Sequence, residues 1–433
     1  MIRRLLFLYA FLLPYEELLG GSWAVKPYRL TGFVLLFLWT TGVVIPRMHL
    51  RLDLFDRVFF FIFYLGLFTA AFWYVVTGKG NVSWALGDFA LFFFVFLVYL
   101  AIKDEVRSFQ DIAALMRPYV MGTVSSVVVY AVLVESPTNG RFEAFDANPN
   151  RLAVAVGVSL FFIVAQFLFV KKTRTGLRLV LYGTSFLVLS ASLLFTGSFG
   201  ALAGIAAGAV VLALLGTRQA LGTRASLSAG RLIAFVALIV LGTAILSNLF
   251  TRYSDESSAI YRYQLGVSHA SRSRLDILQT SWNVAQDHYL LGPGLGEYRY
   301  YHREYIAKLS NVRDIAIADQ DLVAHDDYLD QLNSSGFFGL VMFVALLVIL
   351  ARALFRKLGD RNAPYSLSVF LIVSLTFLCV DGGSHILLRS PDYWFLLALM
   401  TAYIRLRPDS PTQAERRAVA ELPTSSTRSL DTA

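Results

Sequence analysis

Long apolar stretches alternate with short polar segments along almost the whole chain. A bilayer core about 30 Å thick needs about 20 apolar residues in each helix that crosses it. Because lipid offers the backbone no hydrogen-bond partners, such stretches must be helical. The pattern predicts an all-α membrane protein with about twelve transmembrane helices, at 4–20, 29–46, 56–77, 84–102, 112–134, 152–170, 178–196, 199–216, 231–250, 332–351, 366–381 and 391–405.

Lysine and arginine are distributed unevenly between the segments that join these helices. With the N-terminus in the cytoplasm, the cytoplasmic segments contain 22 of them, and the short segments on the opposite face contain six. Cytoplasmic loops of membrane proteins carry such an excess, whereas loops longer than about 60 residues follow the rule poorly, so the longest loop is left out. The bias predicts that both termini are cytoplasmic.

The composition agrees with this prediction. Apolar residues make up 56% of the chain and charged residues 16%, below the roughly 25% that covers the surface of a soluble domain. The net charge of +8 follows from the loop clusters and does not indicate a nucleic-acid partner. The single cysteine, Cys379, lies in an apolar run, which excludes a disulfide framework. We expect a transmembrane domain over 1–407, with a large, partly helical loop at 251–331, and a disordered tail at 408–433.

The long loop carries the first candidate chemistry, with eight basic residues, twelve acidic residues and four of the six histidines. Ser273 and Asp276 have the spacing of a capping box, so we expect a helix to begin there. Arg274 then lies in the first turn, where free backbone N–H groups favour an anion, and its guanidinium fork suits a phosphate; Arg272 is beside it. The alternative is an interfacial helix whose arginine faces lipid headgroups.

A glycine-rich turn at 292–296 is expected to end that helix. It is followed by Tyr298, Arg299 and Arg303 among further tyrosines. These side chains can stack on sugar rings and bind phosphate, or they can form an aromatic belt at the membrane interface. A nucleotide-binding fingerprint is not indicated because no strand precedes the glycines.

His325 stands where a polar segment approaches the predicted span at 332–351, with Asp326 and Tyr328 beside it. A histidine titrates near working pH and is a candidate general base; a solvated helix cap is the alternative. No second ligand pair stands at a metal-binding spacing, so we expect no metal. Shorter loops add further candidates, and two aspartates interrupt the apolar spans: Arg141, Asn148–Arg151, His385 and Arg389, then Asp88 and Asp381.

Four motifs occur in the order found in one family of membrane enzymes. They are Asn148-Pro149-Asn150, Thr196-Gly197-Ser198-Phe199-Gly200, Arg274 with Trp282 and the 292–296 turn, and Ala324–Leu329 followed by Gly336–Leu340. On these motifs the chain resembles the O-antigen ligase (WaaL) and O-antigen polymerase (Wzy) superfamily of integral membrane glycosyltransferases. The twelve-span plan, with one large periplasmic loop before the tenth span, is similar as well.

The resemblance implies a metal-independent, inverting transfer without a cofactor in the bacterial inner membrane, with the active site facing the periplasm. The donor is a glycan on undecaprenyl diphosphate. The acceptor is a hydroxyl of the lipid A core in a ligase, or a second lipid-linked glycan in a polymerase. Arg274, with Arg299 or Arg303, is expected to hold the leaving diphosphate, and His325 to orient or deprotonate the acceptor hydroxyl.

The chain departs from the family pattern at two positions. Phe199 replaces the usual arginine, so Arg141 or Arg151 is expected to supply that diphosphate contact, and Asp326 replaces an asparagine. We favour a ligase because of the compact loop, with a polymerase as the alternative. A transporter of the same lipid is a hypothesis of another class. It is less favoured because transporters gather polar residues at the membrane midplane. A purely structural scaffold leaves His325 unexplained. The oligomeric state is not predicted.

Overall fold

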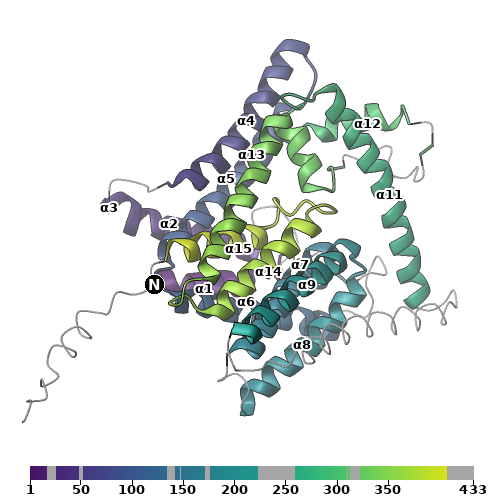
Figure 1. Ribbon diagram of the computed structural model, residues 1–433. Coiled ribbons are helices and arrows are strands. Elements are labelled where there is room, and N and C mark those ends of the chain that lie inside the picture. The colour runs from purple at the N-terminus through teal and green to yellow at the C-terminus, as the bar shows by residue number, and fades with distance from the viewer. Residues whose placement is uncertain are drawn as a thin grey trace, which may run out of the picture.

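The computed structural model describes residues 1–16, 26–47, 52–133, 142–146, 148–170, 176–222, 259–309, 311–312 and 322–406. The predicted span at 231–250 and the predicted tail at 408–433 lie outside these ranges and stay predictions. The first half of the described chain contains α1 (Ile2–Leu12), α2 (Pro27–Trp39), a π-helical turn (Thr40–Val44), α3 (Ile45–Arg47), α4 (Leu54–Thr77), α5 (Val82–Glu105), α6 (Phe109–Leu133) and α7 (Pro149–Phe169). The second half contains α8 (Gly176–Thr196), α9 (Phe199–Gly222), α11 (Ala259–Asp287), α12 (Tyr298–Ile306), α13 (Asp327–Leu358), α14 (Tyr365–Asp381) and α15 (Pro391–Arg405) (Figure 1).

The described part of the chain is helical and contains no strand, as the hydropathy pattern predicted. Eight of its helices are long and apolar enough to cross a membrane, which makes this a multi-pass membrane protein. The full count of twelve spans stays a prediction. The first span differs from its prediction, because α1 ends at Leu12 rather than near residue 20. Pro14 lacks the N–H group that would continue the helical hydrogen bonds, so the helix ends before it.

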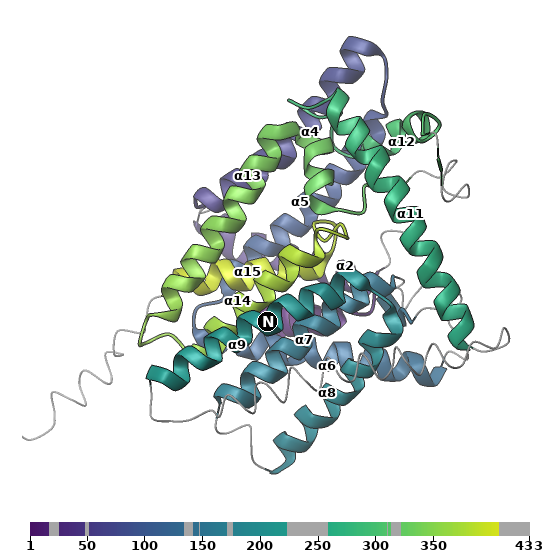
Figure 2. The same cartoon turned by 45° about the vertical axis from the view of Figure 1, so that its right-hand side comes forward.

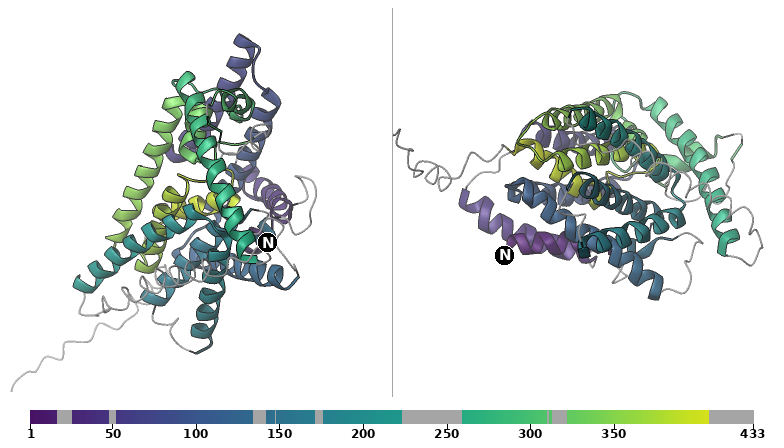
Figure 3. Two further views of the ribbon diagram at one scale, coloured as in Figure 1. Left: turned by 90° about the vertical axis from the view of Figure 1, so that its right-hand side faces the viewer. Right: turned by 60° about the horizontal axis from the view of Figure 1, so that its bottom comes forward.

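The position of α11 corrects the prediction of a helix that begins at Ser273. The helix begins at Ala259, so Ser273 is no N-cap and Arg274 lies in the middle of the helix, away from any free backbone N–H groups. The spacing of a capping box was misleading because serine is also tolerated inside a helix. In Figure 1 α11 forms the right-hand edge, and Figure 3 shows it in front when that side is turned forward. It therefore lies on the outside of the bundle.

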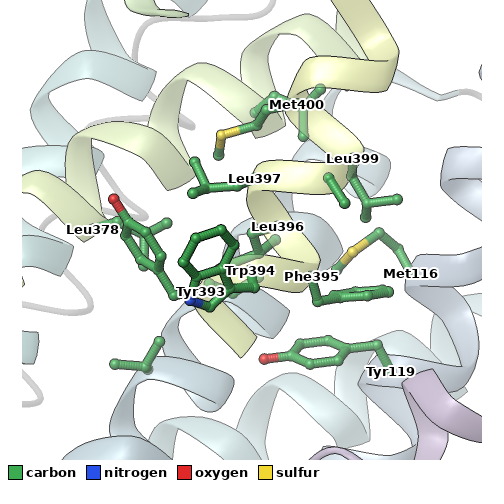
Figure 4. Packing of buried hydrophobic residues seen from close by; sticks show 14 of the residues in the cluster. Met116, Tyr119, Leu378, Tyr393, Trp394, Phe395, Leu396, Leu397, Leu399 and Met400 are labelled. Carbon is green, nitrogen blue, oxygen red and sulfur yellow. The ribbon is translucent and has the colours of Figure 1, made fainter. Parts of the chain in front are cut away.

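The centre of the bundle is formed by α7 and α15, whose side chains are almost all buried. In Figure 4 the rings of Phe395 and Tyr119 lie one above the other, with ring centroids 5.3 Å apart. Trp394, also on α15, donates from its indole nitrogen to the carbonyl of Leu388 at 2.7 Å. These contacts fix the loop before α15, which carries two of the candidate site residues.

The glycine-rich turn at 292–296 follows α11 and packs against α4 and α13. The N–H of Leu295 donates to the carbonyl of Gly66 on α4 at 2.9 Å, and that of Gly294 donates to Asn333 on α13 at 3.2 Å. Gly294 has φ +120°, and a Cβ there meets the backbone of Ala70 at 2.4 Å. The turn can approach both helices this closely only because it lacks side chains.

The helix α13 consists of two parts, because Gly336 has φ 66° and ψ −167°. The part before this break, 327–335, carries buried polar side chains, and the part after it is apolar. In Figure 2 the longer part slants alongside α4, which it contacts. The break lets the polar part turn toward the loop between α14 and α15.

Candidate functional site

Arg274 lies at the meeting point of three elements. Its guanidinium donates to the amide oxygen of Asn150 at the start of α7, at 3.3 Å. The same nitrogen lies 2.8 Å from Nε2 of His385, in the loop between α14 and α15. Asn148, which caps α7, accepts from the N–H of Asn150 and fixes its position. The sequence named all these residues as candidates but did not predict that they meet.

His385 is held from its other side by Asp381, the last residue of α14. The distance from His385 Nδ1 to Asp381 Oδ1 is 2.6 Å. Because a guanidinium only donates, Nε2 of His385 must accept from Arg274, and Nδ1 must carry the proton that it donates to Asp381. Asp381 therefore fixes the tautomer of a neutral histidine that orients Arg274.

The turn between α8 and α9 packs against this group. A Cβ at Gly200 meets the side chains of Ser384, Asp381 and His385 at 1.7, 2.6 and 2.9 Å, so no other residue fits there. The motif with Phe199 in place of arginine thus adjoins the candidate site. Phe199 itself is 55% exposed and brings no charge.

His325 lies immediately before α13 and has φ 53°, a left-handed conformation that is uncommon for a residue with a side chain. Asp326 caps α13 by accepting from the N–H groups of Tyr328 and Leu329 at 2.8 and 2.9 Å. Asp327 donates its N–H to Gly382 at 2.8 Å and accepts from Leu388 at 3.1 Å. These bonds tie the His325 segment to the loop that carries His385.

The electrostatic surroundings of His325 follow from this placement. Burial lowers the pKa of His325 to about 4, and the positive charges of Arg274 and Arg389 act in the same direction. The imidazole is therefore neutral at physiological pH and able to accept a proton.

Other arginines near this end of the bundle are neutralised by carboxylates. Asp88 on α5 pairs with Arg299 at 3.2 Å and with Arg389 at 2.9 Å. Arg389 also lies 3.7 Å from Asp330. Gly296 lets Asp88 approach, because a Cβ at that position meets Asp88 Oδ2 at 2.8 Å. This network joins α5, α12, α13 and the loop before α15.

Arg151 follows the same rule, since it pairs with the buried Glu16, which also binds Lys26. Arg274 differs. It is half-buried, yet among the described residues no carboxylate lies within ion-pair distance of it. Burial lowers the pKa of Arg274, and the charge of Asp381, which lies on the far side of His385, opposes this. Its positive charge has neutral contact partners.

The remaining candidates are placed as follows. Tyr298 is buried between α11 and α12, where its hydroxyl donates to the carbonyl of Ile277 at 3.1 Å. Tyr328 donates to the carbonyl of Cys379 at 2.7 Å. Arg303 is exposed on α12. The side chain of Arg272 and the whole of Arg141 lie outside the described residues.

These features define a multi-pass helical membrane protein in which one end of the bundle gathers a neutral histidine and an arginine with neutral partners. Comparison with known protein families matches part of the chain. Residues 184–344 match the family described as O-antigen ligase, which supports the resemblance to the O-antigen ligase and polymerase superfamily seen in the motifs. No match to the chain was found among curated proteins. The family supports a glycosyltransferase-type activity on lipid-linked glycans.

Proposed function

We propose that the protein is an O-antigen ligase of the bacterial inner membrane, which transfers a glycan from undecaprenyl diphosphate to a hydroxyl of the lipid A core. The observation that carries this proposal is the half-buried guanidinium of Arg274, whose contacts are the neutral side chains of Asn150 and His385. Desolvating a charge is costly unless an opposite charge accompanies it. The diphosphate of the donor supplies that charge.

In this proposal Arg274 binds the diphosphate and stabilises the negative charge that develops on it as the sugar departs. The acceptor oxygen attacks the anomeric carbon from the side opposite the diphosphate, and the bond from that carbon to the diphosphate oxygen breaks. The diphosphate leaves with the electron pair, and the configuration at the anomeric carbon is inverted. No metal is invoked.

The neutral imidazole of His325 accepts the proton of the acceptor hydroxyl as the new bond forms. Its segment, with φ 53° at His325, is held in place by the bond of Asp326 with the N–H of Leu329 and by the bond of Asp327 with the N–H of Leu388. Asp381 and His385 act as positioning residues for Arg274. Arg272 and Arg303 stay candidate contacts for the donor glycan, whereas Arg151 and Arg299 are proposed to be structural because carboxylates neutralise them.

The orientation follows from the distribution of basic residues. The starts of α7, α9 and α15 lie at the same end of the bundle as the His325 segment, because successive spans alternate in direction. The loops at that end are poor in lysine and arginine. We therefore assign this end to the periplasm and both termini to the cytoplasm.

The test is reconstitution of the purified protein with a lipid-linked oligosaccharide and lipid A core, read out as a shift of the product on a gel. We expect Arg274→Ala and His325→Ala each to lower the rate at least about a hundredfold, the usual range for an essential charge-stabilising group or general base. Two matched controls are expected to retain activity: Arg178→Ala, at the exposed start of α8, and His288→Ala, which packs against Trp73.

The same experiment separates the alternatives. A polymerase joins two lipid-linked glycans and ignores lipid A core, whereas a transporter moves the donor across a vesicle without forming product. Wild-type transfer rates in purified, folded His325→Ala contradict the assignment of His325 as the base.

A further inference from the structure

An apolar groove runs between α13 and α14 and starts beside the candidate site. Its volume is about 330 Å³, at the lower end of the range for sites that bind small molecules. The lining residues come from both helices: Tyr328, Val344, Leu347, Val348, Ala351, Phe355, Ile372, Leu375, Thr376, Cys379 and Val380. Figures 1 and 2 both show these two helices next to each other.

The groove offers a ligand only hydrocarbon contacts. Its two hydroxyl groups are already used, because Tyr328 donates to the carbonyl of Cys379 at 2.7 Å and Thr376 donates to that of Ile372 at 3.0 Å. Several lining residues are exposed on the surface of the protein, including Val348 at 50% and Phe355 at 48%. An occupant is therefore an apolar chain that enters from the surrounding lipid.

One end of the groove adjoins the candidate site. Val380 directly precedes Asp381, which holds His385. The ring of Tyr328 lies 3.9 Å from a Cβ placed on Gly383, and Tyr328 follows His325 by three residues. A molecule bound at Arg274 and His325 thus has an apolar path along α13 within reach.

We propose that this groove binds the first isoprene units of the polyprenyl chain of the lipid-linked donor. The proposal rests on the proposed function. The polyprenyl chain is joined directly to the diphosphate, so it must leave the site within a few bonds of Arg274. The acyl chains of the acceptor are separated from the reacting hydroxyl by the whole core oligosaccharide and need no groove at this position.

The first test uses binding alone and does not depend on transfer. The wild-type protein in nanodiscs is photolabelled with a polyprenyl diphosphate that carries a benzophenone on an early isoprene unit, and the adducts are mapped by mass spectrometry. We expect adducts within 344–380 that unlabelled polyprenyl diphosphate removes and an excess of phospholipid does not. Adducts on other helices, or equal competition by phospholipid, overturn the proposal and indicate a bulk-lipid contact only.

The second test compares two alanine-to-tryptophan variants on one helix. Ala351 lines the groove, 15 residues beyond the break at Gly336 and about 22 Å along the helix. Ala345 is exposed and does not line it. Displacing about two methylene groups from an apolar site weakens binding about tenfold. Ala351→Trp is therefore expected to raise the KM of a long-chain donor about tenfold.

The chain length of the donor provides the control. A donor with two isoprene units is too short to reach Ala351, so its KM is expected to stay within about twofold in both variants, as is the KM of either donor with Ala345→Trp. Thr376→Phe fills the same groove from α14 and serves as a second variant if Ala351→Trp does not fold. Equal effects on long and short donors contradict the proposal, whereas a wild-type protein that transfers neither donor contradicts the proposed function instead.

Discussion

The low pKa of His325 predicts an unusual pH profile for transfer. Burial and the neighbouring positive charges hold this pKa at about 4. With that value, about 97% of the imidazole is neutral at pH 5.5, whereas a histidine with the ordinary pKa of 6.5 is only about 10% neutral. If neutral His325 is the base, the rate at pH 5.5 is expected to stay within about twofold of the rate at pH 7.5, and to fall only as the pH approaches 4.

The measurement is the transfer rate at saturating donor from pH 8 to pH 4, with folding checked at each pH. Two variants of Arg389 test whether the fall in rate at low pH (the acid limb of the profile) arises from protonation of His325. Arg389→Gln removes a positive charge that disfavours protonation, so the pKa of His325 rises and the limb moves to higher pH. Arg389→Lys keeps the charge and is expected to leave the limb in place. A wild-type rate that falls tenfold between pH 7.5 and 5.5, or a limb that Arg389→Gln does not move, refutes this reasoning.

Two further predictions concern the glycine-rich turn and the residue after it. Gly294→Ala places a Cβ 2.4 Å from the backbone of Ala70 at φ +120°, and is expected to cost about 3 kcal/mol, seen as a fall in the unfolding temperature in detergent. Gly87→Ala, with nothing within 4 Å, is the neutral control. Burial raises the pKa of Glu297 to about 7, so the folded state binds more protons than the unfolded state between pH 4.5 and 7. The wild type should therefore lose stability relative to Glu297→Gln as the pH rises through that window; parallel stability curves contradict this.

The sequence predicted the helices well because membrane spans must satisfy their backbone internally and need a fixed apolar length. It was wrong about helix ends. At α1 the effect of Pro14 outweighed the continuing hydropathy, and at α11 the helix ran through Ser273 back to Ala259. The start of α11 depends on whether a longer helix can be packed, and this information is not local to the sequence.

The candidate site was predicted as a set of motifs but not as a geometry. Arg274 and His325 were chosen because arginine and histidine suit a diphosphate and a hydroxyl proton. The contacts of Arg274 with Asn150 and His385, 124 and 111 residues away in the sequence, could not be predicted. The ion pair of Asp88 with Arg299 joins residues 211 positions apart and could not be predicted from the sequence either. No local pattern indicates which arginines a distant carboxylate will neutralise.

In the proposed function, that distinction separates structural arginines from functional ones. A buried guanidinium must be compensated, and Glu16 and Asp88 do this permanently for Arg151, Arg299 and Arg389. Arg274 is held by neutral groups, and Asp381 contacts His385 rather than Arg274 itself. Such an arrangement orients the guanidinium without neutralising its positive charge. An anion that binds there therefore does not have to displace a carboxylate. In the proposed function, a permanent carboxylate partner at Arg274 would compete with the diphosphate of the donor, and a catalyst that must bind and release a lipid-linked anion in each cycle requires its absence.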